Sequence, residues 1–263
     1  MTTDVVALDN GLPYRMQNVE WRTLSATASP DVPHAIPLWI CVAPIWVVPG
    51  YFDFLQAHGA KRIVVLSSTS RFTKTRSNDD KEQAVANSLA NAEMQVQEWA
   101  ERCGIEWIIL RPTLIYGLGQ DKNVLEIARF IQRFGFFPLF GNACGLRQPI
   151  HVRDVAAASI AAVDVSGCAN SAYNISGGET LSYRDMVARI FVSLGRRPRM
   201  LTVPLWMFST AVAVLRCLPR YRKWSSSMAE RMNMDMVFDH SAATQGFNFK
   251  PKAFALAAED LPK

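Results

Sequence analysis

The run RIVVL at residues 62–66 is the feature that most constrains the fold. A short, nearly continuous apolar run of this kind is typical of a strand buried on both faces, as in parallel sheets. Apolar residues then recur at a helical period over residues 79–103, with Gly104 just beyond the end. A second apolar run follows at residues 105–110. This order predicts an α/β fold, with a parallel sheet covered by helices on both faces.

Further segments extend the alternation. Residues 5–8, 19–21, 38–42 and 172–175 have the composition of strands, and residues 49–58 and 124–134 that of helices. Ser182 and Asp185 resemble a capping box for a helix that stops at Gly195. Arg111–Pro112 is interpreted as a turn, and Asp154 is expected to cap a helix that runs to residue 164.

The composition indicates a globular chain. With 263 residues, 49% of them hydrophobic and 19% charged, the chain can bury enough apolar surface to offset the entropy of ordering. The five cysteines lie far apart and form no CxxC motif, so we interpret them as reduced thiols without a metal. No secretory signal pattern is visible, and the apolar stretch at 203–215 is too short to span a bilayer. A cytoplasmic protein is therefore expected.

The net charge of +5 arises from one segment. Residues 186–229 hold eight basic residues and no acidic one, which leaves 20 basic against 23 acidic residues, or −3, elsewhere. A general nucleic-acid binder would spread its charge and interleave aromatic residues, so no nucleic acid is expected as a partner. Arg196, Arg197 and Arg199 could frame a phosphate-binding rim, or residues 203–224 could lie on an anionic membrane surface. A third interpretation is a buried helix followed by a solvated basic turn.

The order of the motifs along the chain is more specific than any single motif. The apolar strand, SST, the long helix, a second apolar strand, RPTLIYG and then RQPIHVRDVA follow one another along the chain. This pattern resembles the extended short-chain dehydrogenase/reductase superfamily, and within it the NAD-dependent epimerase/dehydratases of nucleotide sugars. The resemblance covers residues 4–254. It implies a Rossmann-like NAD(P)-binding domain over residues 1–120, to which parts of 145–175 return, and a small substrate-binding domain mainly over 121–263.

The resemblance also implies roles for individual residues. In this family a Ser or Thr after the fifth strand hydrogen-bonds the reacting oxygen, and Thr69 occupies the matching position. The implied cofactor-binding residues are Asp9, Ser67, Ser68, Arg111 and Pro112, and the implied substrate-binding residues are Asn123 and Arg147. The implied cofactor is NAD or NADP, and the implied partner is a nucleotide-linked small molecule. A homodimer stays open.

One departure from the family concerns proton transfer. The family uses a Tyr and a Lys in the motif YxxxK, and no tyrosine of this sequence has a lysine four places on. Aligning the long helix by Ser88 and Glu93 places Val85 and Leu89 at the two positions. Neither side chain carries a proton, so the usual phenol acid/base is missing.

A second departure concerns the cofactor loop. A dinucleotide site opens with a strand, a Gly-rich turn and a helix, because only glycine lets the backbone approach the pyrophosphate closely. The sequence has no GxxGxxG, and residues 5–8 followed by Asp9 resemble the second strand with its ribose-binding acid. The chain is thus expected to begin one βα unit late, roughly 30 residues. Either the start site lies upstream, or the cofactor loop has been lost.

Each implied role has a structural alternative. Thr69 could satisfy local backbone groups, Asp9 could be a turn residue, and Arg111 could anchor a turn. His151 has no evident acid/base partner in the sequence and is expected to be structural. Lys74 is the only basic side chain near Thr69 that could replace the missing lysine.

The expected function is that of an NAD(P)-dependent epimerase/dehydratase-like protein related to nucleotide-sugar oxidoreductases. If the chain is active, the chemistry would be hydride transfer, with Thr69 polarising the reacting oxygen. Two alternatives stay open. One is a non-catalytic nucleotide-binding scaffold or sensor of the same fold. The other is a membrane-peripheral relative similar to the NADH-dehydrogenase accessory subunits, in contact with the membrane through residues 203–224.

Overall fold

The computed structural model describes residues 35–75, 79–205 and 230–262. The expected strands at 5–8 and 19–21, Asp9 and the expected start of the dinucleotide unit lie outside these ranges. Residues 203–224 also lie outside them, apart from the first three.

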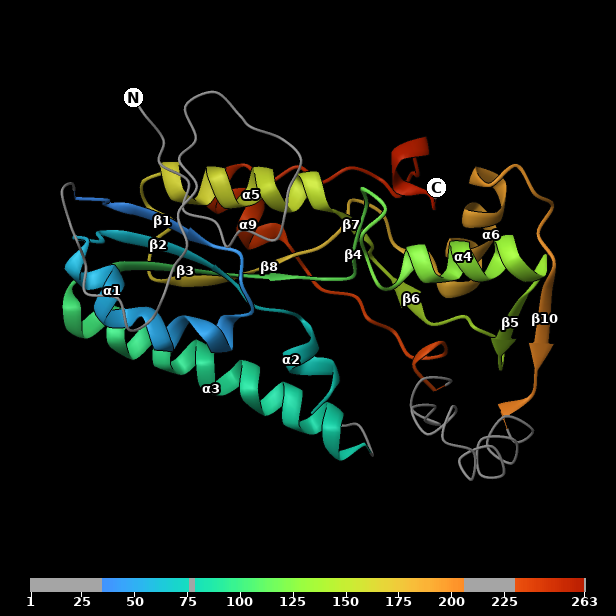
Figure 1. Ribbon diagram of the computed structural model, residues 1–263, viewed down its shortest axis with the longest axis horizontal. Helices are drawn as coiled ribbons and strands as arrows, with labels where there is room; N and C mark the ends of the chain where they lie inside the picture. The colour runs from blue at the N-terminus through green and yellow to red at the C-terminus, as the bar shows by residue number, and fades with distance from the viewer. Residues whose placement is uncertain (1–34, 76–78, 206–229, 263) are drawn as a thin grey trace.

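A four-stranded sheet forms the centre of the described chain (Figure 1). In spatial order its strands are β1 (Leu38–Cys41), β2 (Arg62–Leu66), β3 (Glu106–Pro112) and β8 (Ser171–Ile175). All three neighbouring pairs are parallel. The prediction of an α/β fold with a parallel sheet is therefore confirmed.

Helices cover both faces of this sheet (Figure 1). On one face lie η1 (Ile45–Tyr51), α1 (Phe52–Ala57) and α3 (Asp80–Cys103), and on the other lie α5 (Val152–Asp164) and α9 (Ser241–Phe247). Adjacent residues of β2 show the alternation, since Val65 packs in the cluster with α3 and Val64 in the cluster with α5. Both are fully buried. Burial of each contributes roughly 1.5–3 kcal/mol, so the sheet is stabilised from both sides.

Local sequence sets both ends of α3. The Asp79 side chain accepts a hydrogen bond from the Lys81 main-chain nitrogen at 3.0 Å, which caps the first turn. Gly104 follows the last turn with a φ of 65°, a left-handed conformation that glycine adopts without a Cβ penalty. The buried residues of α3 are Ala86, Leu89, Ala92, Glu93, Val96, Trp99 and Ala100. Glu93 is the one charged member of this set.

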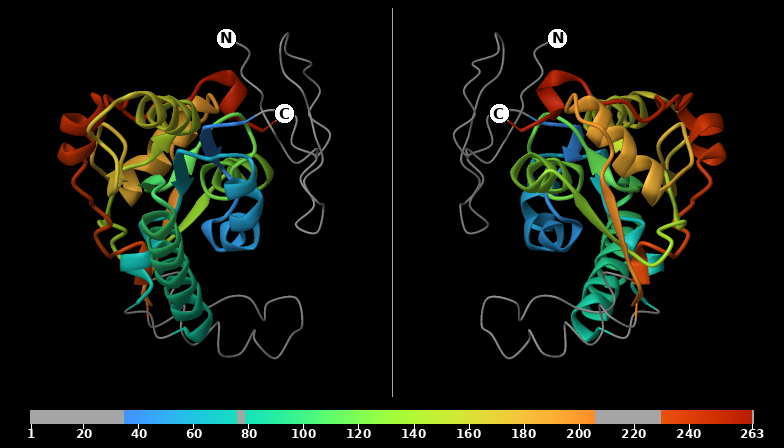
Figure 2. Two further views of the ribbon diagram at one scale, coloured as in Figure 1. Left: turned by 90° about the vertical axis from the view of Figure 1, so that its left-hand side faces the viewer. Right: turned by 90° about the vertical axis from the view of Figure 1, so that its right-hand side faces the viewer.

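A second group of elements lies beyond the carboxyl ends of the strands (Figures 1 and 2). It contains α4 (Val124–Phe134), α6 (Tyr183–Ser193) and the parallel pair β5 (Phe137–Phe140) and β10 (Met200–Val203). These elements share a hydrophobic cluster of their own, which includes the fully buried Ile131 and Phe191. Two short pairings lie between the groups, β4 (Ile115–Tyr116) with β7 (Ile150–His151) and β6 (Leu146–Arg147) with β9 (Leu181–Ser182).

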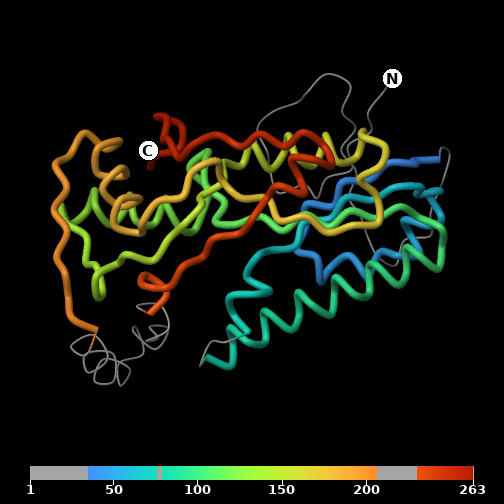
Figure 3. The backbone as a smooth tube through the Cα atoms, turned by 180° about the vertical axis from the view of Figure 1, so that it is seen from behind, coloured from blue at the N-terminus to red at the C-terminus, as the bar shows by residue number. Residues whose placement is uncertain are grey.

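The chain passes between the two groups several times. After β3 it runs through α4, returns to the sheet as α5 and β8, and leaves again through α6 and β10. Helix α9 then comes back to lie against β8, as the red segment of Figure 3 shows. It brings Phe247, and Phe249 just after it, into the cluster that holds Tyr173. Each group is therefore built from segments far apart in the sequence.

Arg111 and Pro112 correct the expected turn. They are the last two residues of β3 and pair with Asn174 and Ile175 of β8. A proline has no amide hydrogen to donate to a ladder, but its carbonyl still accepts, here from the Thr69 main-chain nitrogen. The turn begins only after Pro112.

Two helix starts also differ from expectation. His151, and not Asp154, caps α5, because its Nδ1 accepts from the Arg153 main-chain nitrogen at 3.1 Å. Asp154 lies in the first turn and accepts from the Lys252 main-chain nitrogen at 2.9 Å. The helix expected at 49–58 begins earlier, as the 3-10 segment η1 after Pro44, and becomes α-helical at Phe52.

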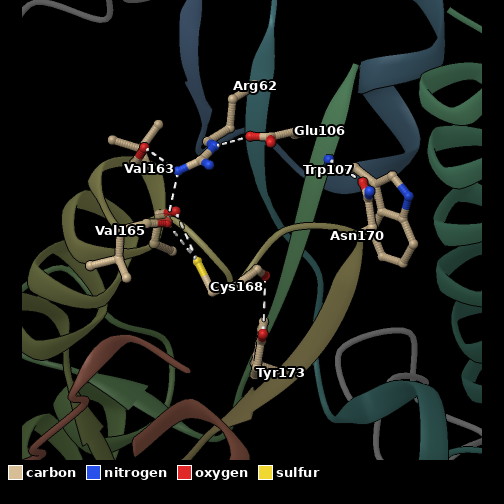
Figure 4. A network of polar contacts seen from close by, with 9 residues as sticks. Arg62, Glu106, Trp107, Val163, Val165, Cys168, Asn170 and Tyr173 are labelled. Carbon is tan, nitrogen blue, oxygen red and sulfur yellow. Dashed lines mark hydrogen bonds and ion pairs between the residues drawn. The ribbon is translucent and has the colours of Figure 1, made fainter. Parts of the chain in front are cut away.

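Arg62 joins the amino end of the sheet to the last turn of α5 (Figure 4). Its Nε donates to Glu106 Oε2 at 2.5 Å, and its Nη1 donates to the carbonyls of Val163 at 2.9 Å and Val165 at 2.8 Å. The last carbonyls of a helix have no intrahelical donor and carry partial negative charge, so a cation stabilises them.

Three other kinds of feature were sought among the described residues: disulfides, metal sites and membrane-spanning helices. Cys41, Cys103, Cys144 and Cys168 are all free thiols. No group of three or more His, Cys, Asp or Glu side chains within the described ranges is placed to hold a metal ion. None of the described helices is both long enough and apolar enough to cross a bilayer.

Candidate functional site at the carboxyl edge of the sheet

Polar residues gather where β2 and β3 end. Ser67, Ser68 and Thr69 follow β2, and Arg111 and Pro112 end β3. The Thr69 main-chain nitrogen donates to the Pro112 carbonyl at 3.1 Å, so the two segments stay paired past the ladder. Ligands of open α/β sheets bind outside the carboxyl ends of the strands, which makes this edge the candidate site.

The Thr69 hydroxyl faces the main chain of β3. Thr69 is buried, and its Oγ1 donates to the Pro112 carbonyl at 3.1 Å. To polarise a reacting oxygen, the hydroxyl would have to give up this bond, because it has a single proton to donate. Ser68 is engaged locally as well, since its Oγ accepts from the Ser70 main-chain nitrogen at 3.1 Å. These contacts match the structural alternative for Thr69.

Glu93 is the centre of a buried polar cluster at this edge. Its carboxylate is 3% exposed and accepts from Ser67 Oγ at 2.5 Å. Arg111 donates to the same carboxylate through Nε at 3.1 and 3.2 Å and through Nη2 at 2.6 Å. Arg71, in the short helix α2 (Ser70–Thr73), forms a further ion pair through Nη1. Two guanidinium groups therefore share one carboxylate.

Both arginines show the effect of burial and of like charge. Burial lowers the pKa of Arg111. Burial also lowers the pKa of Arg71, and the positive charge of Arg111 lowers it further. The two guanidinium carbons lie 5.6 and 5.3 Å from the centre of the Phe72 ring, within the range of a cation–π contact.

The helix positions expected for tyrosine and lysine face the sheet. Leu89 is 3% exposed and Val85 is partly buried, and both pack in the hydrophobic cluster under β2 and β3. Glu93 lies one turn beyond Leu89 on the same helix. Hydrocarbon therefore fills the part of α3 that would have to present the proton-transfer groups.

Arg147 has main-chain partners. Its Nη1 donates to the carbonyls of Leu146 and Met234, both at 2.7 Å, and its Nη2 donates to that of Arg231. The residue is 4% exposed, and burial lowers its pKa to about 10. Its side chain thus fastens the segment at 231–236 to β6.

The other implied residues do not converge on Thr69. Asn123 is exposed at the start of α4, where its main-chain nitrogen donates to Asp121 Oδ1 at 2.9 Å. Lys74 ends α2. No hydrogen bond or ion pair recorded for the described residues joins Thr69 to Lys74, Asn123 or Arg147.

His151 has a partner that the sequence did not reveal. Its Nε2 lies 3.2 Å from Asp260 Oδ1, across 109 positions of sequence. Asp260 also accepts from the main-chain nitrogens of Leu118 at 2.9 Å and Ala257 at 2.8 Å. Burial opposes ionisation of Asp260, but these donors outweigh it and keep its pKa below the usual value. The pair fastens residues 257–260 to the start of α5.

A serine and a histidine also meet where β8 ends. Ser176 Oγ donates to the Phe238 carbonyl at 3.0 Å and lies 2.6 Å from His240 Nδ1. Ser176 is completely buried. The hydroxyl is out of reach of a substrate, so this pair is a packing contact and not a nucleophile with its base.

The described residues do not fit the pyrophosphate of a dinucleotide. The turns that follow β1 and β2 contain no glycine. The glycines after β8 approach protein backbone, since a Cβ at Gly177 would lie 1.9 Å from the Pro149 carbonyl oxygen and one at Gly178 would lie 2.3 Å from that of Pro251. Their missing side chains make room for the chain itself and leave none for a phosphate.

A small cavity of about 220 Å³ lies beside α5, lined by residues that include Asp154, Ala158, Phe247 and Lys250. Pockets that bury a drug-sized ligand have volumes of about 300–1,000 Å³. This cavity is too small for a nucleotide sugar, and the carboxyl edge of the sheet remains the better candidate.

Comparison with protein-family models identifies the sheet region. Residues 52–176 match the NAD dependent epimerase/dehydratase family. These residues contain β2, β3, β8 and the helices α3 and α5, and with them the whole Glu93 cluster.

Two curated relatives differ in kind. A UDP-glucose 4-epimerase of Vibrio cholerae is 25% identical over 135 residues, which is 51% of this chain and 41% of that protein. The mitochondrial NADH dehydrogenase (ubiquinone) 1 alpha subcomplex subunit 9 of Arabidopsis thaliana is 26% identical over 140 residues, or 53% of this chain and 30% of that protein. The chain thus spans less than half the length of either.

Solved structures share the fold. The UDP-glucuronic acid 4-epimerase of Bacillus cereus, solved in complex with NAD, superposes with a TM-score of 0.61 at 12% identity and covers 93% of this chain and 78% of its own. The ordered motifs, the parallel sheet and the match over residues 52–176 agree with one another. The match over residues 52–176 therefore places this part of the chain among the distant relatives of the NAD-dependent epimerase/dehydratase family.

Proposed function

We propose that this chain binds a nucleotide-linked sugar at the carboxyl edge of its sheet without performing the hydride and proton transfers of an epimerase or dehydratase. The ligand class is suggested by the relatives, one of which is a UDP-glucose 4-epimerase and another a UDP-glucuronic acid 4-epimerase. The described edge offers cationic and hydroxyl donors of the kind that such ligands require.

The observation that carries the proposal is the packing of Val85 and Leu89. Both side chains are hydrocarbon; Leu89 lies in the core under the sheet, and Val85 is partly buried against it. Proton transfer needs a titratable group within hydrogen-bond reach of the substrate, and an aliphatic side chain supplies none. Nearby groups do not substitute for it, since Thr69 donates to Pro112 and Glu93 is neutralised by two arginines.

A binding function is consistent with the rest of the edge. The Glu93 cluster carries one more positive than negative charge, and Arg71 keeps 31% of its side chain exposed. A partly exposed cation beside an aromatic ring favours a ligand with phosphate oxygens.

Calorimetric titration of the 263-residue chain with UDP-glucose and UDP-glucuronic acid, with NAD and NADP as separate titrants, tests binding. The same preparation is then incubated with each sugar nucleotide and cofactor, and the products are separated by chromatography. We expect a sugar nucleotide to bind and no epimer or dehydrated product to form. The Vibrio cholerae epimerase, assayed alongside, shows that the assay detects turnover. Product formed by this chain would overturn the non-catalytic part, and absence of sugar-nucleotide binding would overturn the whole proposal.

A further inference from the structure

The charge of the Glu93 cluster is unbalanced. Arg71 and Arg111 both pair with Glu93, and no other ion pair of either arginine is recorded among the described residues. The cluster therefore carries a net charge of about +1, in a place where all three side chains are at least two-thirds buried. Like charges in a partly buried place repel one another more strongly than in water, so a second anion would stabilise the pair.

The two arginines also have donors to spare. The Glu93 carboxylate accepts hydrogen bonds from Nε and Nη2 of Arg111 and from Nη1 of Arg71. Arg71 Nε and Nη2 and Arg111 Nη1 have no recorded partner in the described part of the chain, and none of them is among its buried unpaired atoms. These nitrogens therefore reach solvent and can donate to a ligand.

An aromatic ring holds the guanidinium groups in place. Phe72 follows Arg71 directly, and its ring lies within cation–π distance of both guanidinium carbons, at 5.6 and 5.3 Å. The Phe238 ring lies 6.1 Å away, and 42% of Phe72 is exposed. Held between a carboxylate and a ring, an arginine loses less freedom when it binds a ligand than a free surface arginine would.

The position is suited to a ligand. Helix α2 leaves the carboxyl end of β2 and lies beside α3, so Arg71 stands at the edge where ligands of parallel sheets bind (Figure 1). Planar guanidinium forks match phosphate oxygens in two-point contacts.

From this geometry we infer that Arg71 and Arg111 form an oxyanion site that takes a phosphate group of a nucleoside diphosphate. The inference deepens the proposed function and rests on it for the identity of the nucleotide. Arg111 is anchored to Glu93 at two nitrogens and keeps one for the ligand, while Arg71 is anchored at one nitrogen and keeps two. Arg71 therefore supplies most of the contact.

Arg71→Gln is the discriminating variant, because it removes the more exposed cation and leaves the Arg111–Glu93 pair intact. Arg71→Lys keeps the charge and removes the planar fork. Arg129→Gln is the matched control, since Arg129 is an exposed arginine in a surface ion pair with Glu126 on α4. Thermal unfolding of each variant checks that the fold is kept, and Arg71→Lys provides the comparison if Arg71→Gln fails to fold.

The titrants are UDP, inorganic pyrophosphate and uridine, measured by calorimetry at low and at high salt. We expect Arg71→Gln to weaken the binding of UDP and of pyrophosphate about tenfold or more, because the variant loses a charge-assisted hydrogen bond. Arg71→Lys should fall between this variant and the wild type, and Arg129→Gln should bind like the wild type. Uridine has no phosphate, so its binding should not depend on Arg71. High salt should weaken UDP binding more in the wild type than in Arg71→Gln.

The outcomes separate the two proposals. If wild type and Arg71→Gln bind UDP equally well, the oxyanion site is wrong and the proposed function stands. If the wild type binds pyrophosphate through Arg71 but no sugar nucleotide, the proposed function is wrong and the oxyanion site stands. If the wild type binds neither UDP nor pyrophosphate, the oxyanion site is refuted.

Discussion

Arg111 at the end of β3 forms an ion pair with Glu93 in the middle of α3, and two nitrogens of its guanidinium group donate to the carboxylate. Nε lies 3.1 and 3.2 Å from the two carboxylate oxygens, and Nη2 lies 2.6 Å from Oε2. The contact joins the sheet to its covering helix at the edge where a ligand would bind. The same carboxylate therefore supports both the fold and the charge of the candidate site.

Glu93→Gln should destabilise the protein strongly. The amide keeps the shape of the side chain but loses the charge, which leaves two guanidinium groups facing each other with no anion between them. Breaking one side of a buried ion pair costs about 3–5 kcal/mol, and partial exposure of Arg71 puts the expectation at the lower end. Urea unfolding measures the loss. Glu126→Gln, at a carboxylate that is 58% exposed, serves as the control and should cost no more than about 1 kcal/mol. Equal effects of the two substitutions would contradict a stabilising role for the buried Glu93 carboxylate.

Leu89→Lys should not restore a family-like proton-transfer pair. The side chain at this position is 3% exposed and packed under the sheet, so a lysine there would bury its ammonium group in hydrocarbon. We expect the free energy of unfolding to fall by about 2–5 kcal/mol, as for the loss of a core leucine. Leu89→Met, which conserves volume, should cost less than about 1.5 kcal/mol. Chemical denaturation of the two variants side by side checks this, and a Leu89→Lys protein as stable as Leu89→Met would contradict it.

Asp260→Asn should make a pH-dependent difference to stability. The donors around Asp260 hold its pKa below the usual value in the folded state, so the carboxylate stabilises the fold above the unfolded pKa of about 3.9. That contribution is lost as the pH falls through the folded pKa. At pH 7 the substitution turns an amide nitrogen toward a main-chain donor and should cost about 1–3 kcal/mol.

The measurement is urea unfolding of wild type and Asp260→Asn at pH 7 and again near pH 3. The gap between the two proteins should be widest at pH 7 and should narrow toward the acid. Glu259→Gln alters the neighbouring residue, whose side chain is 47% exposed in a surface ion pair with Arg153. It should stay within about 1 kcal/mol of wild type at pH 7. A gap for Asp260→Asn that does not change with pH would argue against an ionised carboxylate.

Arg62→Met should loosen the last turn of α5. The substitution keeps an apolar stem but removes the donors to the Val163 and Val165 carbonyls and the pair with Glu106. Arg62 is 11% exposed at its side chain, so the loss should reach about 2 kcal/mol. Hydrogen exchange should show faster exchange at the end of α5 than at its start. Arg153→Gln, at an arginine that is 62% exposed, is the control and should leave the exchange pattern unchanged.

The sequence predicts elements well where both ends carry local signals. α3 and α4 match their expected ranges closely, because Asp79 caps one and left-handed Gly104 and Gly135 end them both. The Arg111–Pro112 turn fails because the residues that make it a strand, Asn174 and Ile175, come from β8, far along the chain. A local pattern cannot report a partner of that kind.

The residues of the candidate site also differ in how far the sequence predicts their surroundings. Val85 and Leu89 could be placed on a buried face from periodicity alone, and Glu93 lies one helical turn beyond Leu89. Its burial is therefore foreseeable. The contact of Arg71 with Glu93 is not foreseeable, because the direction of the Arg71 side chain depends on how α2 leaves β2. The pairing of Asp260 with His151 likewise exists only in the complete fold. The roles of Thr69, Asn123 and Arg147 toward a ligand stay predictions.

The return of α9 to the sheet has a consequence for biosynthesis. A ribosome makes β1, β2, β3 and β8 long before residues 241–249, yet Phe247 and Phe249 of that late segment cover the face around Tyr173. Until they emerge, the nascent sheet exposes this apolar face, and chaperones bind such surfaces. The cover of this face of the sheet is therefore completed only after most of the chain has left the exit tunnel.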